Sequence, residues 1–192
     1  MKRICIIWLF ILLSSCSNEV ERVEKGYVHS NEVIGWTIVV PSDWTLTKME
    51  QEESSNDSTN VSKQSNSENL DNYLFSFEKD EFNMFQSSVE PFKEDYNGEW
   101  IQNVKGVKQL LCDVYSKEGI KMDTTATIST QLVGKEFLSY ETRLYANDGT
   151  LKLSQIFYST LQNNHDFTIC LNYNSPDYRE ELIDILSRSR FY

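Results

Sequence analysis

Gly35-Trp36-Thr37-Ile38-Val39-Val40-Pro41-Ser42-Asp43-Trp44 is the stretch of this 192-residue chain that decides its fold. The β-branched residues favour a strand, and Pro41 ends it because proline has no N–H to donate to a sheet. The Pro-Ser-Asp sequence favours a turn, since proline presets its own φ angle and an aspartate side chain can bond the nearby backbone. We expect Trp44 to fold back onto the core.

Outward from this stretch, the sequence predicts further strands. They are expected at 73–77, 83–89, 124–132, 136–145, 151–160 and 167–173, which are rich in β-branched or aromatic residues or alternate between apolar and polar ones. Asn147-Asp148-Gly149 is a strong hairpin signal, because Asn, Asp and Gly are favoured in the tight turns that join two strands. Successive strands joined in this way form an antiparallel sheet.

Two helices are also predicted. The first is capped by Asp95 or Asn97, runs to about Lys117 and stops at Gly119. Its apolar residues recur at three- and four-residue steps and are expected to pack on a sheet: Trp100, Val104, Val107, Leu111, Val114 and Tyr115. The second follows Ser175-Pro176-Asp177, which supplies a cap, a proline and an acidic residue for the first turn. Its stripe is Tyr178, Leu182, Ile185 and Leu186. The predicted fold class is α+β, with a central antiparallel sheet flanked by helices.

Two stretches resemble the PsbP-like fold, the architecture of the extrinsic photosystem PsbP proteins and their bacterial relatives. Residues 35–44 are similar to its opening strand, proline turn and tryptophan, and residues 167–191 are similar to its closing strand and helix. The resemblance spans residues 33–192. It implies an α/β/α sandwich that binds other proteins, and it carries no catalytic residues.

The beginning of the chain has the pattern of an export signal. Lys2 and Arg3 precede an unbroken apolar run at 4–13, which is too short to span a bilayer as a helix. Leu13-Ser14-Ser15-Cys16 then resembles a bacterial lipobox. That resemblance implies cleavage before Cys16, lipidation of this cysteine and anchoring to a membrane. The alternative is an ordinary signal peptide in which Cys16 has no role.

The expected organisation follows from this signal. It comprises a lipoprotein signal peptide at 1–15, a tether at 16–32 and a single PsbP-like domain at 33–192. Within the domain, residues 50–69 are mostly Ser, Asn, Gln and acidic residues, which bury too little apolar surface to offset their ordering entropy. We therefore expect a disordered insertion there. The expected location is the cell envelope, with the lipid in the outer membrane and the domain on its periplasmic or surface face.

The charge of the chain bears on its partners. The formal net charge is −11, and the mature part becomes more acidic when Lys2 and Arg3 leave with the signal. Such a surface argues against nucleic acid, whose binding depends on Lys and Arg at phosphates. It leaves two interpretations, which are a solvated acidic surface and attraction to a basic protein partner in the envelope.

Residues that carry chemistry are sparse. The two histidines, His29 and His165, have no His, Cys or Glu neighbour at metal-ligand spacing. The acidic groups at 78–81 and 180–184 are typical of solvated surfaces, and Cys112 and Cys170 could form a disulfide or stay free. No catalytic residue, metal site or cofactor is therefore predicted. The predicted function is a non-catalytic, protein-binding module; the alternative is an envelope hydrolase or carbohydrate-binding enzyme whose site forms only in three dimensions.

Overall fold

The structure is a computed structural model that describes residues 26–47 and 74–192. The expected signal peptide, Cys16 and the expected insertion at 50–69 lie outside the described residues.

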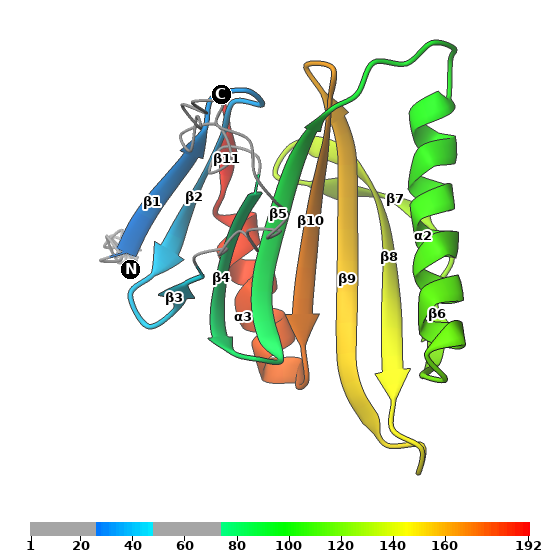
Figure 1. Cartoon of the computed structure of the whole chain (residues 1–192). Helices are drawn as coiled ribbons and strands as arrows, with labels where there is room; N and C mark the ends of the chain where they lie inside the picture. The colour runs from blue at the N-terminus through cyan, green and yellow to red at the C-terminus, as the bar shows by residue number, and fades with distance from the viewer. Residues whose placement is uncertain (1–25, 48–73) are drawn as a thin grey trace, which may run out of the picture.

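The largest element is an antiparallel sheet of eight strands (Figure 1). Its order is β3-β4-β5-β10-β9-β8-β6, and β7 also pairs with β8. The strands are β3 (Thr45–Leu46), β4 (Leu74–Asp80), β5 (Asn83–Pro91), β6 (Lys121–Thr124), β7 (Ile128–Leu132), β8 (Lys135–Tyr145), β9 (Leu151–Gln162) and β10 (His165–Tyr173). The predicted hairpin joins β8 to β9, where the backbone N–H of Thr150 donates to Asp148 Oδ1 at 2.9 Å.

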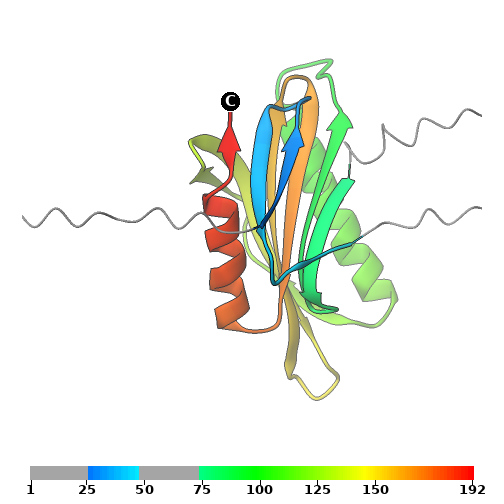
Figure 2. The same cartoon turned by 90° about the vertical axis from the view of Figure 1, so that its left-hand side faces the viewer.

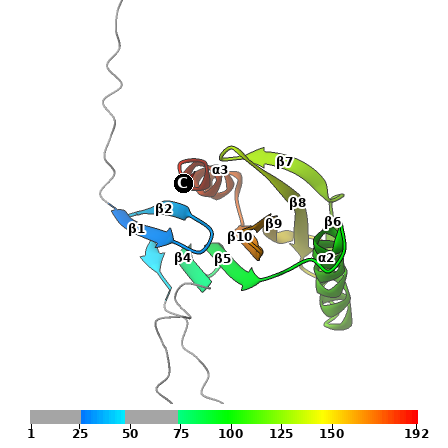
Figure 3. The same ribbon diagram turned by 90° about the horizontal axis from the view of Figure 1, so that it is seen from above.

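A second layer covers one face of this sheet (Figure 2). It contains helix α3 (Pro176–Ser187) and a three-stranded sheet of β1 (Gly26–Asn31), β2 (Trp36–Pro41) and β11 (Arg190–Phe191). Helix α2 (Glu99–Lys117) lies on the opposite face, beside β6 and β8 (Figure 3). The α+β class is thus confirmed, but the predicted sandwich is incomplete, because a small sheet shares the layer of α3.

The prediction of a tether over residues 16–32 is wrong for residues 26–31, which form a strand. Residues Gly26–Asn31 form β1, which pairs with the whole of β2 in an antiparallel register. The pairing supplies backbone hydrogen bonds that the local composition does not reveal, and the ring of His29 stacks on Phe75 with centroids 3.8 Å apart. The ordered domain therefore begins before residue 33.

The core lies between the large sheet and the layer of β2 and α3. Its members come from both layers: Ile34, Trp36, Ile38, Val40, Trp44, Phe77, Phe85, Val89, Phe137, Ile156, Tyr158, Phe167, Ile169, Leu171, Tyr173, Leu182, Ile185 and Leu186. The predicted fold-back of Trp44 is confirmed, since its side chain is buried and its Nε1 donates to Glu181 Oε1 on α3 at 2.8 Å. The predicted stripe of α3 is confirmed too, because Leu182, Ile185 and Leu186 are fully buried.

Helix α2 departs from its prediction at its beginning and on its surface. Its N-cap is Gly98 at φ 87°, without a side-chain cap, so neither Asp95 nor Asn97 has the expected role. The stop at Gly119 is confirmed, with φ 72°. Of the six residues expected to pack on the sheet, Val104 is buried, whereas Val107 and Val114 are exposed. Fewer apolar side chains of α2 therefore pack on the sheet than the three- and four-residue spacing of its apolar residues predicts.

The cysteine alternatives are resolved by the arrangement of α2 and β10. Cys112 on α2 and Cys170 on β10 are both free thiols. Burial raises the pKa of Cys170 to about 12, so this thiol stays protonated and unreactive at neutral pH.

The environment of His29 predicts a dependence of stability on pH. Burial lowers the pKa of His29 in the folded protein below 6.5, so the unfolded chain binds more protons. His29 should therefore stabilise the fold above pH 6.5 and lose this contribution as the pH falls below 6.5 and through the lower pKa of the folded state. Thermal unfolding at about pH 7.5 and about pH 5.5 should show a larger loss of Tm in the wild type than in His29→Phe, which keeps a ring but cannot titrate. Equal losses in the two proteins would contradict the role of His29.

Candidate functional site

The edge of the large sheet is interrupted between β6 and β7. Both strands pair with β8, but Thr124 lies opposite Thr142 whereas Ile128 lies opposite Ser139. The three residues 125–127 therefore lie opposite only two residues of β8, Tyr140 and Glu141. The edge strand has one residue more than a regular ladder would pair. The continuous strand predicted over 124–132 is wrong for this reason, since register is set by pairing with β8 rather than by local propensity.

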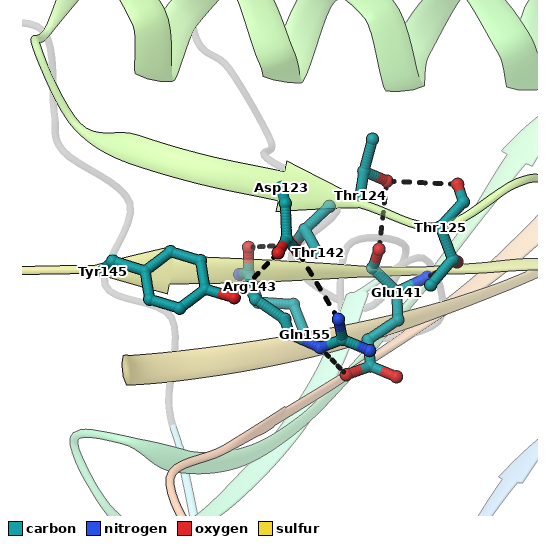
Figure 4. Close-up of polar contacts among 8 residues, drawn as sticks. All are labelled: Asp123, Thr124, Thr125, Glu141, Thr142, Arg143, Tyr145 and Gln155. Carbon is teal, nitrogen blue, oxygen red and sulfur yellow. Dashed lines mark hydrogen bonds and ion pairs between the residues drawn. The ribbon is translucent and has the colours of Figure 1, made fainter. Parts of the chain in front are cut away.

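Threonine side chains replace the missing ladder bonds at this interruption (Figure 4). The backbone N–H of Glu141 donates to Thr125 Oγ1 at 2.9 Å, and Thr124 Oγ1 donates to the carbonyl of Glu141 at 3.0 Å. The N–H of Thr125 also donates to the carbonyl of Glu141, at 2.9 Å. The β8 backbone is thus held at Glu141 although the edge strand leaves it.

A cavity of about 420 Å³ opens beside the interruption, between the edge strands and the first turn of α3. Its lining residues come from four places: Thr125 and Ala126 of the interruption, Ile128 and Thr130 of β7, Ser139, Tyr140, Glu141, Ile156 and Tyr158 of β8 and β9, and Arg179 of α3. Its floor is ordered, because Ile156, Ser139 and Tyr158 are buried and Thr130 Oγ1 lies 2.6 Å from Ser139 Oγ. A cavity of this volume is large enough for a small ligand.

A line of charges runs along β8 from the cavity (Figure 4). Arg143 Nε donates to Glu141 Oε1 at 3.0 Å, and Arg143 Nη1 lies 3.6 Å from Asp123 Oδ1 on β6. Tyr145 Oη donates to Asp123 Oδ2 at 2.7 Å. The hydrogen bond with Glu141 and its negative charge raise the pKa of Arg143. Arg143 therefore stays charged and offsets part of the negative charge that Glu141 brings to the cavity.

The charges of Glu141 and Arg179 act on the phenols of Tyr158, which lines the cavity, and of Tyr173. Burial raises the pKa of Tyr158, an effect that Arg179 opposes and Glu141 reinforces. Burial and Glu141 likewise raise the pKa of Tyr173, and Arg179 opposes this shift. Arg179 and Glu141 both line the cavity, and they act on these two phenols in opposite directions.

The lining of the cavity is suited to binding rather than to acid–base or nucleophilic chemistry. Glu141 is the one carboxylate among its lining residues, and it is already bonded to Arg143. Two-carboxylate hydrolysis needs a second, differently protonated acid at the same place. Residues 26–47 and 74–192 also contain no group of three or more His, Cys, Asp or Glu side chains that could hold a metal ion.

The residues considered at the level of sequence lie elsewhere. His29 stacks in the β1 layer, and His165 begins β10, where its Nδ1 lies 2.8 Å from the carbonyl oxygen of Asn163. The acidic residues near the ends of β4 and α3 serve local contacts, such as Asp80 with the backbone and side chain of Asn83 and Asp184 with Arg188. Sequence reasoning missed Glu141 and Arg179, because a charged residue in an alternating strand or a first helical turn has the pattern of an ordinary surface position.

Helix α2 presents a second surface of interest. Val107, Leu110 and Val114, named here the α2 flank, are 53%, 62% and 46% exposed. Their spacing of three and four residues places them on one side of the helix. The sheet side of α2 is fixed by polar bonds, since Trp100 Nε1 donates to Asp166 Oδ1 at 3.0 Å and Tyr115 Oη donates to Gln155 Oε1 at 3.3 Å. The α2 flank is therefore held in solvent.

No helix in the described part of the chain is both long and apolar enough to cross a bilayer.

Comparisons with known proteins identify the fold. No protein-family model matches the chain, and no curated protein matches its sequence. The solution structure of cyanobacterial PsbP (CyanoP) from Synechocystis sp. is similar at a TM-score of 0.60 and 12% identity, covering 94% of this chain and 99% of that one. A crystal structure from Bacteroides thetaiotaomicron is similar at a TM-score of 0.51 and 10% identity. The match covers 88% of this chain and 48% of that one. The domain has a PsbP-like fold.

The threonine bonds at the interruption predict a local stability effect. Thr125→Val keeps the side-chain shape but removes the acceptor of the Glu141 N–H. We expect at least about tenfold faster hydrogen exchange at that amide and a loss of at most about 1 kcal/mol in the free energy of unfolding, because the site is exposed to water. Thr45→Val, in edge strand β3, is the matched control and should leave this amide unchanged. Unaltered exchange at Glu141 in Thr125→Val would contradict the role of the hydroxyl.

Proposed function

We propose that this chain is a lipid-anchored, non-catalytic module of the cell envelope that binds another protein through the α2 flank. The anchor is Cys16, and the outer membrane is the proposed location. The single observation that carries the binding role is the exposure of Val107, Leu110 and Val114 on one side of a helix whose other side is bonded to the sheet. Apolar residues gathered in this way on a surface are typical of protein interfaces.

The charges at the N-terminal end of α2 favour a basic partner. Acidic residues gather where β5 leads into α2: Glu90, Glu94, Asp95 and Glu99. Tyr96, 53% exposed, lies in the same connection, and Ile101, 40% exposed, lies in the first turn of α2. A protein that presents an apolar ridge next to Lys or Arg side chains would match both parts of this surface. The net charge of −11 would also steer such a partner toward the domain.

The binding role is favoured over the enzyme alternative by the content of the cavity. A hydrolase would need convergent acids or an activated nucleophile at the reacting bond. The cavity offers one carboxylate, Glu141, whose Oε1 is engaged by Arg143. The fold shared with cyanobacterial PsbP supports a non-catalytic domain.

Lipidation is tested by labelling cells with an acyl-chain probe. The wild-type chain should carry the label, whereas Cys16→Ser should lose it and accumulate as the uncleaved precursor, because the lipid is attached through the cysteine sulfur. Cys112→Ser is the matched control and should keep the label. Label retained in Cys16→Ser would overturn the anchor.

Partner binding is tested by placing a photo-crosslinking residue at Leu110 in the full-length chain and irradiating intact cells that make it naturally. We expect one adduct with a basic envelope protein. Adding Val114→Glu should reduce this adduct at least about tenfold, since a charge would then be buried in the interface. Leu151, 48% exposed at the β8–β9 hairpin, is the control position for both the crosslinker and a glutamate substitution. The same adducts from positions 110 and 151, or an adduct insensitive to Val114→Glu, would refute the α2 flank as the interface.

A further inference from the structure

The cavity beside the β6–β7 interruption is separate from the α2 flank. Its lining comes from β7, β8, β9 and α3, whereas the α2 flank lies on a helix that covers the opposite face of the sheet (Figure 3). The protein-binding role therefore leaves the cavity without a function. Its floor is held by the Thr130–Ser139 contact and the buried side chains of Ile156 and Tyr158, so it does not depend on a partner for its shape.

The two charged residues that line the cavity have opposite signs, and Lys108 of α2 lies beside it, where its Nζ donates to the carbonyl of Thr125 at 2.5 Å. Glu141 and Arg179 line it, and Arg143 and Asp123 follow directly along the β8 side. Among the lining residues there is one acid and one guanidinium, so a net anion or a net cation would leave one of these two groups uncompensated. A ligand with one positive and one negative group would satisfy both charges that face the cavity.

Arg179 is the charge that is most available to a ligand. Its side chain lies on the first turn of α3 at the exposed rim, where it hydrogen-bonds Tyr173 but is in no ion pair given for the described residues. A guanidinium can bind a carboxylate through two parallel N–H donors. Glu141 uses Oε1 for Arg143, which leaves acceptor capacity for an ammonium group.

The remaining walls suit an aliphatic group. Ile128, Ala126 and Ile156 supply apolar surface, and Ile128 is 58% exposed at the rim. The volume of about 420 Å³ accommodates a small molecule with room for bridging water.

We propose that this cavity binds a small zwitterion, namely a free α-amino acid with an aliphatic side chain. The carboxylate of the ligand contacts Arg179, and its ammonium group contacts Glu141. Its side chain packs on Ile128 and Ile156. The same chemistry is present in a short aliphatic peptide, so the test separates these two sources.

The test is calorimetric titration of the full-length protein in detergent with L-leucine, with the dipeptide Leu-Leu, and with two leucine analogues that each lack one charge. The analogues are 3-methylbutylamine, without the carboxylate, and 4-methylpentanoate, without the ammonium. We expect saturable binding of leucine, and at least about tenfold weaker binding of both analogues, because each leaves one charged group of the protein unpaired. Tighter binding of leucine than of Leu-Leu would support the free amino acid, and the reverse would support a peptide terminus with the same chemistry.

Two variants locate the site. Arg179→Met should weaken leucine binding about tenfold to a hundredfold, which is the range for a lost charged hydrogen bond. Ala126→Trp should abolish binding by filling the cavity while every charge is kept. Arg190→Met, on β11 and outside the lining, is the matched control and should bind leucine as the wild type does.

Several results would overturn the proposal. These are absence of saturable leucine binding, equal binding of 4-methylpentanoate and leucine, or unchanged binding in Arg179→Met. The outcome is independent of the α2 flank, because the crosslink from position 110 should persist in both Arg179→Met and Ala126→Trp.

Discussion

The indole of Trp36 joins the two layers of the domain. It lies parallel to the ring of Phe85 on β5 and 5.0 Å from the ring of Phe167 on β10, measured between centroids. Its Nε1 donates to Ser189 Oγ at 3.0 Å, which satisfies a buried hydroxyl just after α3. One side chain of β2 thus contacts the large sheet and the end of the chain. Gly35, at φ 62°, is required beside it, because a Cβ there would lie 2.6 Å from the carbonyl oxygen of Tyr192.

This contact has consequences for the face of the sheet that carries the cavity. With β2 and β11 packed over β5 and β10, α3 lies alongside them (Figure 2). Arg179 of its first turn lines the cavity together with residues of β7, β8 and β9. Arg179 is delivered there by the cap of the helix, where Ser175 Oγ accepts the N–H of Tyr178 at 3.4 Å. The interruption of the edge strand then leaves space next to Arg179 that a regular β-ladder would fill. The cavity is therefore a product of the docking of α3 and of the register shift along β8.

The two faces of the large sheet are covered to different extents. The face toward β2 and α3 holds the core aromatic residues, whereas α2 contacts the other face through polar bonds and a narrow apolar stripe. Few apolar residues of α2 contact the sheet, because the chain connections to β5 and β6 set the position of the helix. The spacing of its apolar residues does not set it. Apolar residues beyond the stripe remain in water, which costs free energy unless another molecule covers them. The α2 flank and the cavity therefore lie on opposite faces of the sheet, and Lys108 of α2 connects the helix to the cavity at Thr125.

The sequence by itself determined most of the elements and the fold class. Local signals were sufficient for the strand ended by Pro41, the Asn147-Asp148-Gly149 hairpin, the cap of α3 at Ser175 and the stop of α2 at Gly119, because each depends on residues within a few positions. Only the tertiary structure decided that β1 is a strand, that residues 125–127 leave the ladder and that Val107 and Val114 face water. It also decided that Glu141 and Arg179 meet at one cavity. These features depend on pairing and packing between segments far apart in the chain, and neither the register of a strand nor the exposed side of a helix is set by local sequence.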